Sequence, residues 1–156
     1  MRVQICAVGR LRAGPERDLV DDYLARFDRT GRALGLGPAT ITEVDDRKGG
    51  GVAAECALLQ RAIPKGATVC ALDERGRVMT SPEFADLLAD WRDQGAGTAV
   101  FLIGGADGLD KCLRDQAQTR LSFGKMVWPH MLARVMLAEQ LYRASTILAG
   151  GPYHRT

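Results

Sequence analysis

The sequence predicts an α/β fold with a mostly parallel sheet flanked by helices. Strand-like segments alternate with helix-like segments along all 156 residues, which is typical of parallel strands joined by helical connections. Residues 98–103 form a continuous apolar run, as expected of a central strand covered on both faces. The length suits one domain with its own core, so we predict a single domain over residues 1–156.

The other predicted strands differ in how apolar they are. Residues 3–8 and 68–72 are apolar enough to form buried strands. Residues 40–44 alternate polar and apolar side chains, as an exposed or edge strand does. Residues 121–128 are expected to form a short strand, or a strand followed by a loop.

Helix start signals lie between these strands. Pro15 opens the first helix, because the N–H that proline lacks is not needed in a first helical turn. Thr80 and Glu83 have the spacing of a capping box, and Pro129 opens a long last helix. The predicted helices begin near residues 15, 52, 81, 109 and 129. Loops are expected at residues 31–38 and 45–51, and the second is polar, glycine-rich and expected to be mobile.

The composition excludes few classes of function. Lys and Arg number 21 and Asp and Glu 19, and this balance neither requires nor excludes a nucleic-acid partner. No apolar run approaches the roughly 20 residues of a membrane span, and the N-terminus lacks a secretory signal, so we expect a cytoplasmic protein without membrane contact. Four cysteines without a C-x-x-C pair, together with only two histidines, predict no metal site.

A glycine-rich turn, FLIGGADG at 101–108, follows the central strand. Gly104, Gly105 and Gly108 do not have the dinucleotide-binding spacing G-x-G-x-x-G, and no G-K-[ST] phosphate loop is present. The turn therefore serves a tight strand-to-helix connection, or it lets a ligand such as an adenosine derivative approach the main chain. Ligands of parallel sheets bind beyond the carboxyl ends of strands, which here are predicted at residues 72–73, 103–105 and 123–124.

The C-terminal third carries both histidines and a cluster of other polar groups. Glu139 and Arg143 are four residues apart on the predicted last helix and can form an ion pair, either on the surface or in a site. Tyr153, His154 and Arg155 place an aromatic ring, an imidazole and a guanidinium side by side. Such a set can stack on a base, move a proton and hold an anion, although chain ends are also often bland.

Several of these motifs together resemble the ribosomal RNA large subunit methyltransferase H (RlmH) family of the SPOUT methyltransferases. The resemblance runs nearly end to end and rests on LIGGADGL, on the stretch from LSFGKM through WPHMLARVMLAEQLYRASTILAGGPYHR, and on the N-terminal MRVQICAVGRLR. It implies a fold with a C-terminal trefoil knot, S-adenosylmethionine as cofactor and a homodimer. It also implies methylation of N3 of a pseudouridine in helix 69 of 23S rRNA, on the assembled ribosome.

The resemblance also implies site residues. The cofactor is expected against Leu72, Gly104, Gly105, Phe123, Gly124, Lys125, Met126, Val127 and Trp128. Lys125 departs from the family pattern, because it places a charge where a neutral residue is expected. For catalysis we expect His154 to handle the N3 proton, since imidazole titrates near neutral pH. Arg143 and Arg155 are expected to stabilise the imide charge or bind a phosphate, and Tyr153 to stack on or orient the base.

Three alternatives stay open at this point. The chain could be a non-catalytic ribosome-binding protein, which predicts no cofactor binding. It could be a SPOUT enzyme with a different RNA target. An α/β nucleotide hydrolase is disfavoured, because the sequence has neither a phosphate loop nor a cluster of metal ligands.

Overall fold

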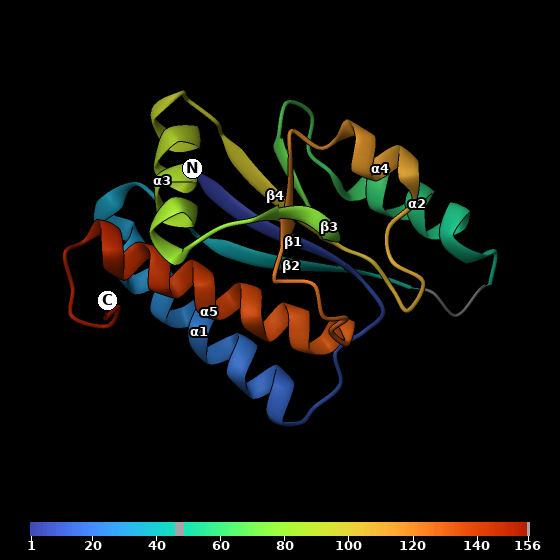
Figure 1. Cartoon of the computed structure of the whole chain (residues 1–156), viewed down its shortest axis with the longest axis horizontal. Coiled ribbons are helices and arrows are strands. Elements are labelled where there is room, and N and C mark those ends of the chain that lie inside the picture. The colour runs from blue at the N-terminus through green and yellow to red at the C-terminus, as the bar shows by residue number, and fades with distance from the viewer. Residues whose placement is uncertain (46–48, 156) are drawn as a thin grey trace.

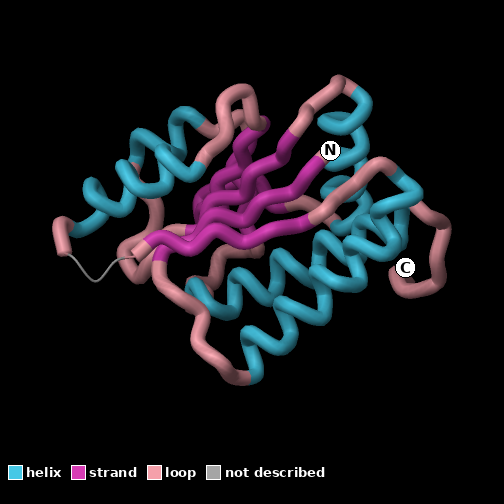
Figure 2. The backbone as a smooth tube through the Cα atoms, turned by 180° about the vertical axis from the view of Figure 1, so that it is seen from behind, coloured by secondary structure: helices cyan, strands magenta, loops and turns pink. Residues whose placement is uncertain are grey.

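The computed structural model describes residues 1–45 and 49–155, in which a five-stranded sheet lies between two layers of helices (Figures 1 and 2). The strands are β1 (Arg2–Val8), β2 (Ala39–Val44), β3 (Thr68–Val78), β4 (Thr98–Ile103) and β5 (Thr119–Ser122). The helices are α1 (Pro15–Gly31), α2 (Gly51–Ala62), α3 (Ser81–Asp93), α4 (Lys111–Gln116) and α5 (His130–Leu148), with a 3-10 turn at Arg32–Leu34. Residues 46–48 of the predicted loop at 45–51 lie outside the described residues.

The strand order is β2-β1-β4-β3-β5, and all neighbouring strands are parallel. The predicted α/β class with a parallel sheet is therefore confirmed, as are the edge position of β2 and the central position of β4. Alternate side chains of β4 enter two apolar layers: Phe101 packs on the side of α1, α3 and α5, and Leu102 packs on the side of α2 and α4.

Two strand boundaries differ from the prediction. β5 begins at Thr119 and ends at Ser122, so most of the segment predicted at 121–128 is a loop. Gly124 has a φ of +113°, a backbone conformation that ends an extended strand and that glycine adopts without strain. β3 runs on to Val78 instead of ending at Leu72, because a bulge lets both Leu72 and Arg77 pair with Leu121.

The helix signals in the sequence are largely confirmed. α1 begins at Pro15, and the capping box is formed: Thr80 N donates to Glu83 Oε2 at 2.7 Å, and Glu83 N donates to Thr80 Oγ1 at 3.3 Å. α4 begins two residues later than expected, because the Asp110 carboxylate accepts from Cys112 N at 2.7 Å and so caps the helix. Part of the loop predicted at 31–38 is the 3-10 turn. Among the described residues, no helix combines the length and the apolarity needed to cross a membrane.

Candidate functional site

A cavity of about 850 Å³ lies at the carboxyl edge of the sheet, between the bulge of β3, the ends of β4 and β5 and the start of α5. It is of the size that proteins use for cofactors. Eight of the nine residues predicted to hold the cofactor line it: Leu72, Gly104, Gly105, Phe123, Gly124, Met126, Val127 and Trp128. Lys125 is the exception, since its side chain is exposed and does not contribute to the lining.

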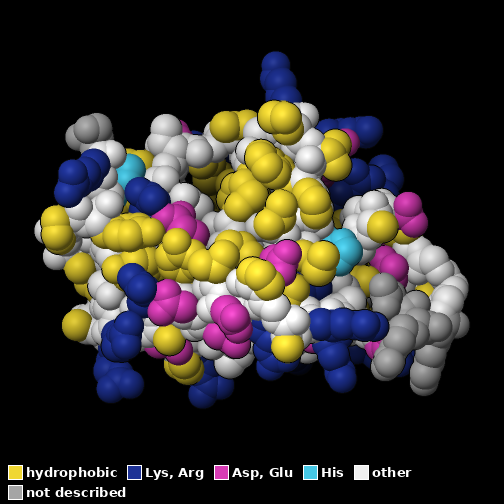
Figure 3. Space-filling view, turned by 90° about the horizontal axis from the view of Figure 1, so that it is seen from below, with side chains coloured by type: hydrophobic (Ala, Val, Ile, Leu, Met, Phe, Trp, Pro, Cys, Tyr) yellow, Lys and Arg dark blue, Asp and Glu magenta, His cyan; other side chains and the backbone are white. Residues whose placement is uncertain are grey.

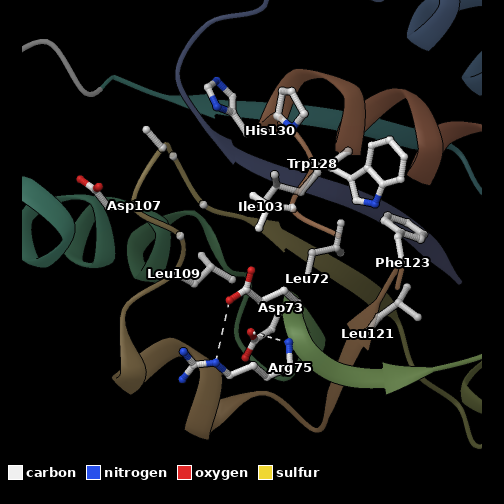
Figure 4. A pocket seen from close by; sticks show the side chains of 18 of the residues that line it. Leu72, Asp73, Arg75, Ile103, Asp107, Leu109, Leu121, Phe123, Trp128 and His130 are labelled. Atoms are coloured by element: carbon white, nitrogen blue, oxygen red, sulfur yellow. Dashed lines mark hydrogen bonds and ion pairs between the residues drawn. The ribbon is translucent and has the colours of Figure 1, made fainter. Parts of the chain in front are cut away.

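The cavity has an apolar side and a polar side. In Figure 4 the side chains of Leu72, Ile103, Phe123 and Trp128 gather along one side, whereas Asp73 and Arg75 lie on the other. The apolar side suits a flat aromatic group such as adenine, and an acidic group suits the ribose hydroxyls or positive charge of a nucleoside-like cofactor.

Asp73 is the most buried acid of this lining, with a side chain only 6% exposed. Its Oδ1 accepts from Arg75 N at 3.1 Å. Its Oδ2 is 3.6 Å from Arg114 Nη1 and has no hydrogen-bond partner among the described residues. A buried carboxylate oxygen that lacks a full set of partners is costly, and a ligand hydroxyl or amine would offset that cost. Asp73 was predicted at a strand end but not as a residue of the site.

The glycine turn has a structural reason that does not require a ligand. A Cβ at Gly104 would lie 2.4 Å from the carbonyl carbon and oxygen of Gly108, closer than real contacts allow. Gly108 N donates to Gly105 O at 3.0 Å, which closes the turn, and Gly108 has a φ of +78°. The sequence left two explanations open, a tight turn or the close approach of a ligand, and the tight turn accounts for Gly104. Gly104 nevertheless lines the cavity.

The loop between β5 and α5 is held at its first residues. Gly124 N donates to Ser122 Oγ at 3.1 Å, and that hydroxyl lies 3.0 Å from Glu74 O and 2.9 Å from Gly124 O. Beyond this anchor the side chains of Met126 and Val127 are strongly exposed, at 72% and 80%. The loop therefore presents apolar side chains at the rim of the cavity.

Arg134 fixes the first part of α5 against the sheet. Its side chain is 1% exposed, and its Nη2 donates to the carbonyl oxygens of Val8 and Gly9 at 2.7 Å each. Its Nη1 donates to Glu43 Oε1 at 3.1 Å. Burial lowers the pKa of Arg134, and the Glu43 carboxylate opposes this effect. The guanidinium thus ties α5 to the carboxyl ends of β1 and β2, beside the cavity.

Three of the four residues predicted to be catalytic, Arg143, Tyr153 and His154, come together, but at the other end of α5. Glu139 Oε1 accepts from Arg143 Nε and Nη2, at 3.0 and 2.5 Å, and from Tyr153 Oη at 3.1 Å. Arg143 also lies over the Tyr153 ring, 4.9 Å from its centroid, and its Nη1 is 3.3 Å from His154 Nδ1. Arg155 follows directly and is exposed.

These contacts fix the chemical state of two groups. Burial raises the pKa of Tyr153, and hydrogen bonds with Tyr23 and Glu139 raise it further, so the phenol is neutral and donates. Arginine has only donors, so His154 Nδ1 accepts from it, and the ring proton of the neutral imidazole is on Nε2. In this arrangement His154 offers an N–H donor.

The Tyr153 ring is in contact with side chains of α5. It lies 4.6 Å from the Tyr142 ring, centroid to centroid, and the Arg143 guanidinium lies 4.9 Å from its centroid. Tyr153 therefore anchors the tail to α5. Glu139 forms the predicted ion pair with Arg143 and also accepts from Tyr153, so it joins α5 to the tail.

One chain does not bring the cavity and the tail cluster together. Ala133, the last α5 residue of the cavity lining, and Arg143 of the tail cluster are ten positions apart, which corresponds to about 15 Å at the rise of an α-helix. The cavity lies at the first residues of α5 and the tail cluster at its last turns (Figure 1). The chain contains two histidines, and Figure 3 shows them far apart on one face, with apolar side chains between them.

Comparisons with known proteins assign the family. The family model "Predicted SPOUT methyltransferase" matches residues 1–154. Proteins named ribosomal RNA large subunit methyltransferase H from Dinoroseobacter shibae and Roseobacter denitrificans are 74% and 68% identical to this chain, each over 99% of both sequences.

Solved structures agree on the fold. A probable methylase family protein from Haemophilus influenzae matches with a TM-score of 0.55 at 12% identity, covering 99% of this chain and 70% of its own. TrmJ from Zymomonas mobilis matches with a TM-score of 0.53 at 17% identity, covering 100% and 72%. The chain therefore belongs to the SPOUT methyltransferases, and within them to the ribosomal RNA large subunit methyltransferase H family, whose methyl donor is S-adenosylmethionine.

Proposed function

We propose that this chain transfers the methyl group of S-adenosylmethionine to N3 of a pseudouridine in helix 69 of 23S rRNA, on the assembled ribosome. The names of the relatives support large-subunit ribosomal RNA as the substrate. The cavity supports the cofactor, with apolar side chains for the adenine and Asp73 for a polar group. The nucleotide and the atom follow from the family resemblance and are the part that the experiment below tests.

We further propose that the active site is completed by a second copy of the chain. The observation that carries this proposal is that the cavity and the tail cluster use different parts of α5, with Ala133 of the cavity and Arg143 of the cluster about 15 Å apart along the helix axis. In a homodimer the tail cluster of one subunit can lie against the cavity of the other. Exposed apolar side chains at the cavity rim provide surface for such an association, namely Met126, Val127, Trp128, Met131 and Leu132.

The residues of the tail have separate roles in this proposal. The uracil ring gains negative charge when its N3 proton leaves to water, and the resulting anion then takes the methyl group as S-adenosylhomocysteine departs. Donors aimed at that charge lower the barrier. His154 Nε2–H and the guanidinium of Arg155 are the donors that the tail can present. Arg143 fixes His154 through Nδ1, and Glu139 fixes Arg143. This replaces the expected role of His154 as a base with a role as a donor.

S-adenosylmethionine supplies an electrophilic methyl group, and the protein aligns it with the attacking nitrogen. Leu72, Phe123 and Trp128 would bind the adenine, and the main chain at Gly104 and Gly105 would line its path. The apolar rim would exclude water from the reacting atoms once the second copy covers it. We propose that the chain segments around this cavity form the trefoil knot that is expected of the family.

The charge of the chain favours the ribosome over free RNA. A net charge of only +2 gives weak general affinity for phosphates, so recognition has to depend on a shaped surface. We therefore expect a cytoplasmic enzyme that acts on assembled particles and methylates naked 23S rRNA poorly.

The test uses purified protein, S-adenosylmethionine and ribosomes from a strain that lacks the modification. Mass spectrometry of the digested rRNA is expected to show N3-methylpseudouridine, formed much faster on ribosomes than on naked 23S rRNA. A different methylated nucleoside would mean a SPOUT enzyme with another target. Absence of cofactor binding in calorimetry would mean a non-catalytic ribosome-binding protein.

A further inference from the structure

A group of potential metal ligands lies between α2 and α4, outside the site described above. Cys56 is on α2, and Asp110 and Cys112 are at the start of α4. One ligand atom from each, two thiol sulfurs and one carboxylate oxygen, lie within 4.8 Å of one another. We propose that these three residues bind a thiophilic divalent cation, with Zn²⁺ as the natural occupant.

The ligand set fits this metal. Zn²⁺ prefers tetrahedral coordination by thiolates, imidazoles and carboxylates, with Zn–S near 2.3 Å and Zn–O near 2.0 Å. These lengths place tetrahedral ligand atoms about 3.5–3.8 Å apart, so side-chain adjustments of about 1 Å form the site. Three protein ligands leave the fourth position to water. Mg²⁺ and Ca²⁺ are disfavoured, because both prefer oxygen ligands.

Neighbouring groups form hydrogen bonds with the proposed ligands, as groups around the ligands of metal sites commonly do. The side-chain amides of Gln60 and Gln116 donate to Cys112 Sγ, at 3.4 and 3.3 Å, and so hold the sulfur in place. Asp110 uses Oδ1 to cap α4 through Cys112 N, which holds the carboxylate in place and leaves Oδ2 for a cation. Cys56 is buried and Cys112 is exposed, so a cation can reach the group from solvent.

The position of the group suggests what it does. Leu109 directly precedes Asp110, lines the cofactor cavity and packs in the same apolar cluster as Cys56. A cation held here would pin α4 to α2 and so fix the segment that forms one wall of the cavity. The sequence predicted no metal site because no two cysteines are close along the chain. The fold brings together ligands that are 54 and 56 positions apart.

The test is a Co²⁺ titration of the full-length protein with its thiols kept reduced. We expect one equivalent of Co²⁺ per chain to produce thiolate-to-metal charge-transfer absorption, and an equivalent of Zn²⁺ to abolish it. Zn²⁺ should also raise the thermal unfolding midpoint. Cys112→Ser removes an exposed ligand without disturbing the core, and it should weaken Zn²⁺ binding on the order of 100-fold.

Asp110→Asn is the sharper variant, because asparagine caps a helix as well as aspartate does but lacks the anionic ligand. It should weaken Zn²⁺ binding while leaving the metal-free midpoint unchanged. Asp115→Asn, an exposed carboxylate on the same helix that pairs with Lys111, is the matched control and should bind Zn²⁺ like the parent protein. The proposal would be overturned if the parent protein showed no charge-transfer absorption, or if Cys112→Ser bound the metal as tightly as the parent and with the same absorption. Neither cofactor nor RNA enters this measurement, so its outcome is independent of the methyl-transfer proposal.

Discussion

The two ends of α5 lie in chemically different surroundings. At its first residues the surroundings are strand ends, exposed main chain and apolar side chains, which select a ligand by shape. At its last turns the surroundings are a carboxylate, two guanidiniums, a phenol and an imidazole, most of them joined by hydrogen bonds. The first arrangement can bind a nucleoside-like cofactor, and the second can hold charge in a fixed place.

Each end also uses an arginine in its own way. Arg134 is buried, and its partners are mostly backbone carbonyls, so it holds the helix to the sheet. Arg143 is partly exposed, and its partners are side chains of the tail and of its own helix. Substitutions at the cavity end should therefore affect stability and cofactor binding, and substitutions at the tail end should affect turnover.

The largest expected effect is at the cavity end. Arg134→Met leaves the carbonyls of Val8 and Gly9 and the Glu43 carboxylate without their buried partner, and it should lower the free energy of unfolding by about 3–5 kcal/mol. Urea denaturation measures it. Arg17→Met breaks only an exposed pair with Asp21 and should cost at most about 1 kcal/mol. Equal losses for the two variants would contradict the anchoring role of Arg134.

The tail end should separate binding from turnover. His154→Ala removes the proposed donor to the uracil anion and should reduce turnover about 100-fold to 1,000-fold, equivalent to about 3–4 kcal/mol. Its affinity for S-adenosylmethionine should be unchanged, because the side chains proposed to bind the adenine, Leu72, Phe123 and Trp128, stay in place. Single-turnover methylation of ribosomes and calorimetry measure the two quantities. Near-normal turnover would remove His154 from catalysis.

The glycine turn gives a smaller effect at the cavity end. In Gly104→Ala the new Cβ would meet the Gly108 backbone at 2.4 Å, so the turn must shift, at a cost of about 1–3 kcal/mol and with loss of cofactor affinity. Gly97→Ala is the control, because nothing lies within 4 Å of a Cβ there and no φ restriction applies. If calorimetry found parental affinity in Gly104→Ala, the turn would not shape the cavity.

The smallest effect concerns the tail anchor. Tyr153→Phe removes the hydrogen bond to Glu139 and should cost about 0.5–1.5 kcal/mol at neutral pH. Burial raises the pKa of this phenol above its ordinary value of 10.0, so the folded state retains the proton more tightly than the unfolded state.

The difference in the pKa of Tyr153 between the folded and unfolded states makes the stability depend on pH. The stability that the neutral Tyr153 phenol contributes is complete below about pH 10 and is lost as the pH rises beyond it. The gap in stability between the parent protein and Tyr153→Phe should therefore narrow above pH 10, as measured by denaturation at several pH values. A gap that stays constant would mean that the phenol is not protected in the folded state.

Local patterns in the sequence predicted much of the fold. The apolar run at 98–103 identified β4 as central, because a strand that is buried on both faces is apolar throughout. The alternation at 40–44 identified β2 as an edge strand, because only one of its faces is buried. The end of β3 could not be predicted. Its polar continuation pairs with β5 only through a bulge, and a bulge depends on the partner strand.

The candidate site shows the same division. Strand ends and the resemblance predicted eight of the residues that line the cavity, because parallel sheets bring those ends to one edge. The hydrogen bond from Tyr153 to Glu139 was missed, since it depends on the fold of the tail, which chain ends rarely reveal. The distance between tail and cavity likewise depends on the tertiary arrangement.

The most direct test of the composite site uses a heterodimer of two defective chains. Gly104→Ala and His154→Ala subunits carrying different tags are coexpressed, and the mixed dimer is purified and assayed on unmodified ribosomes. If the tail of one subunit serves the cavity of the other, one of the two sites is intact, and activity should be about half that of the parent dimer. If each tail serves its own cavity, both sites carry a defect, and a mixed dimer as inactive as either parent variant would contradict the account.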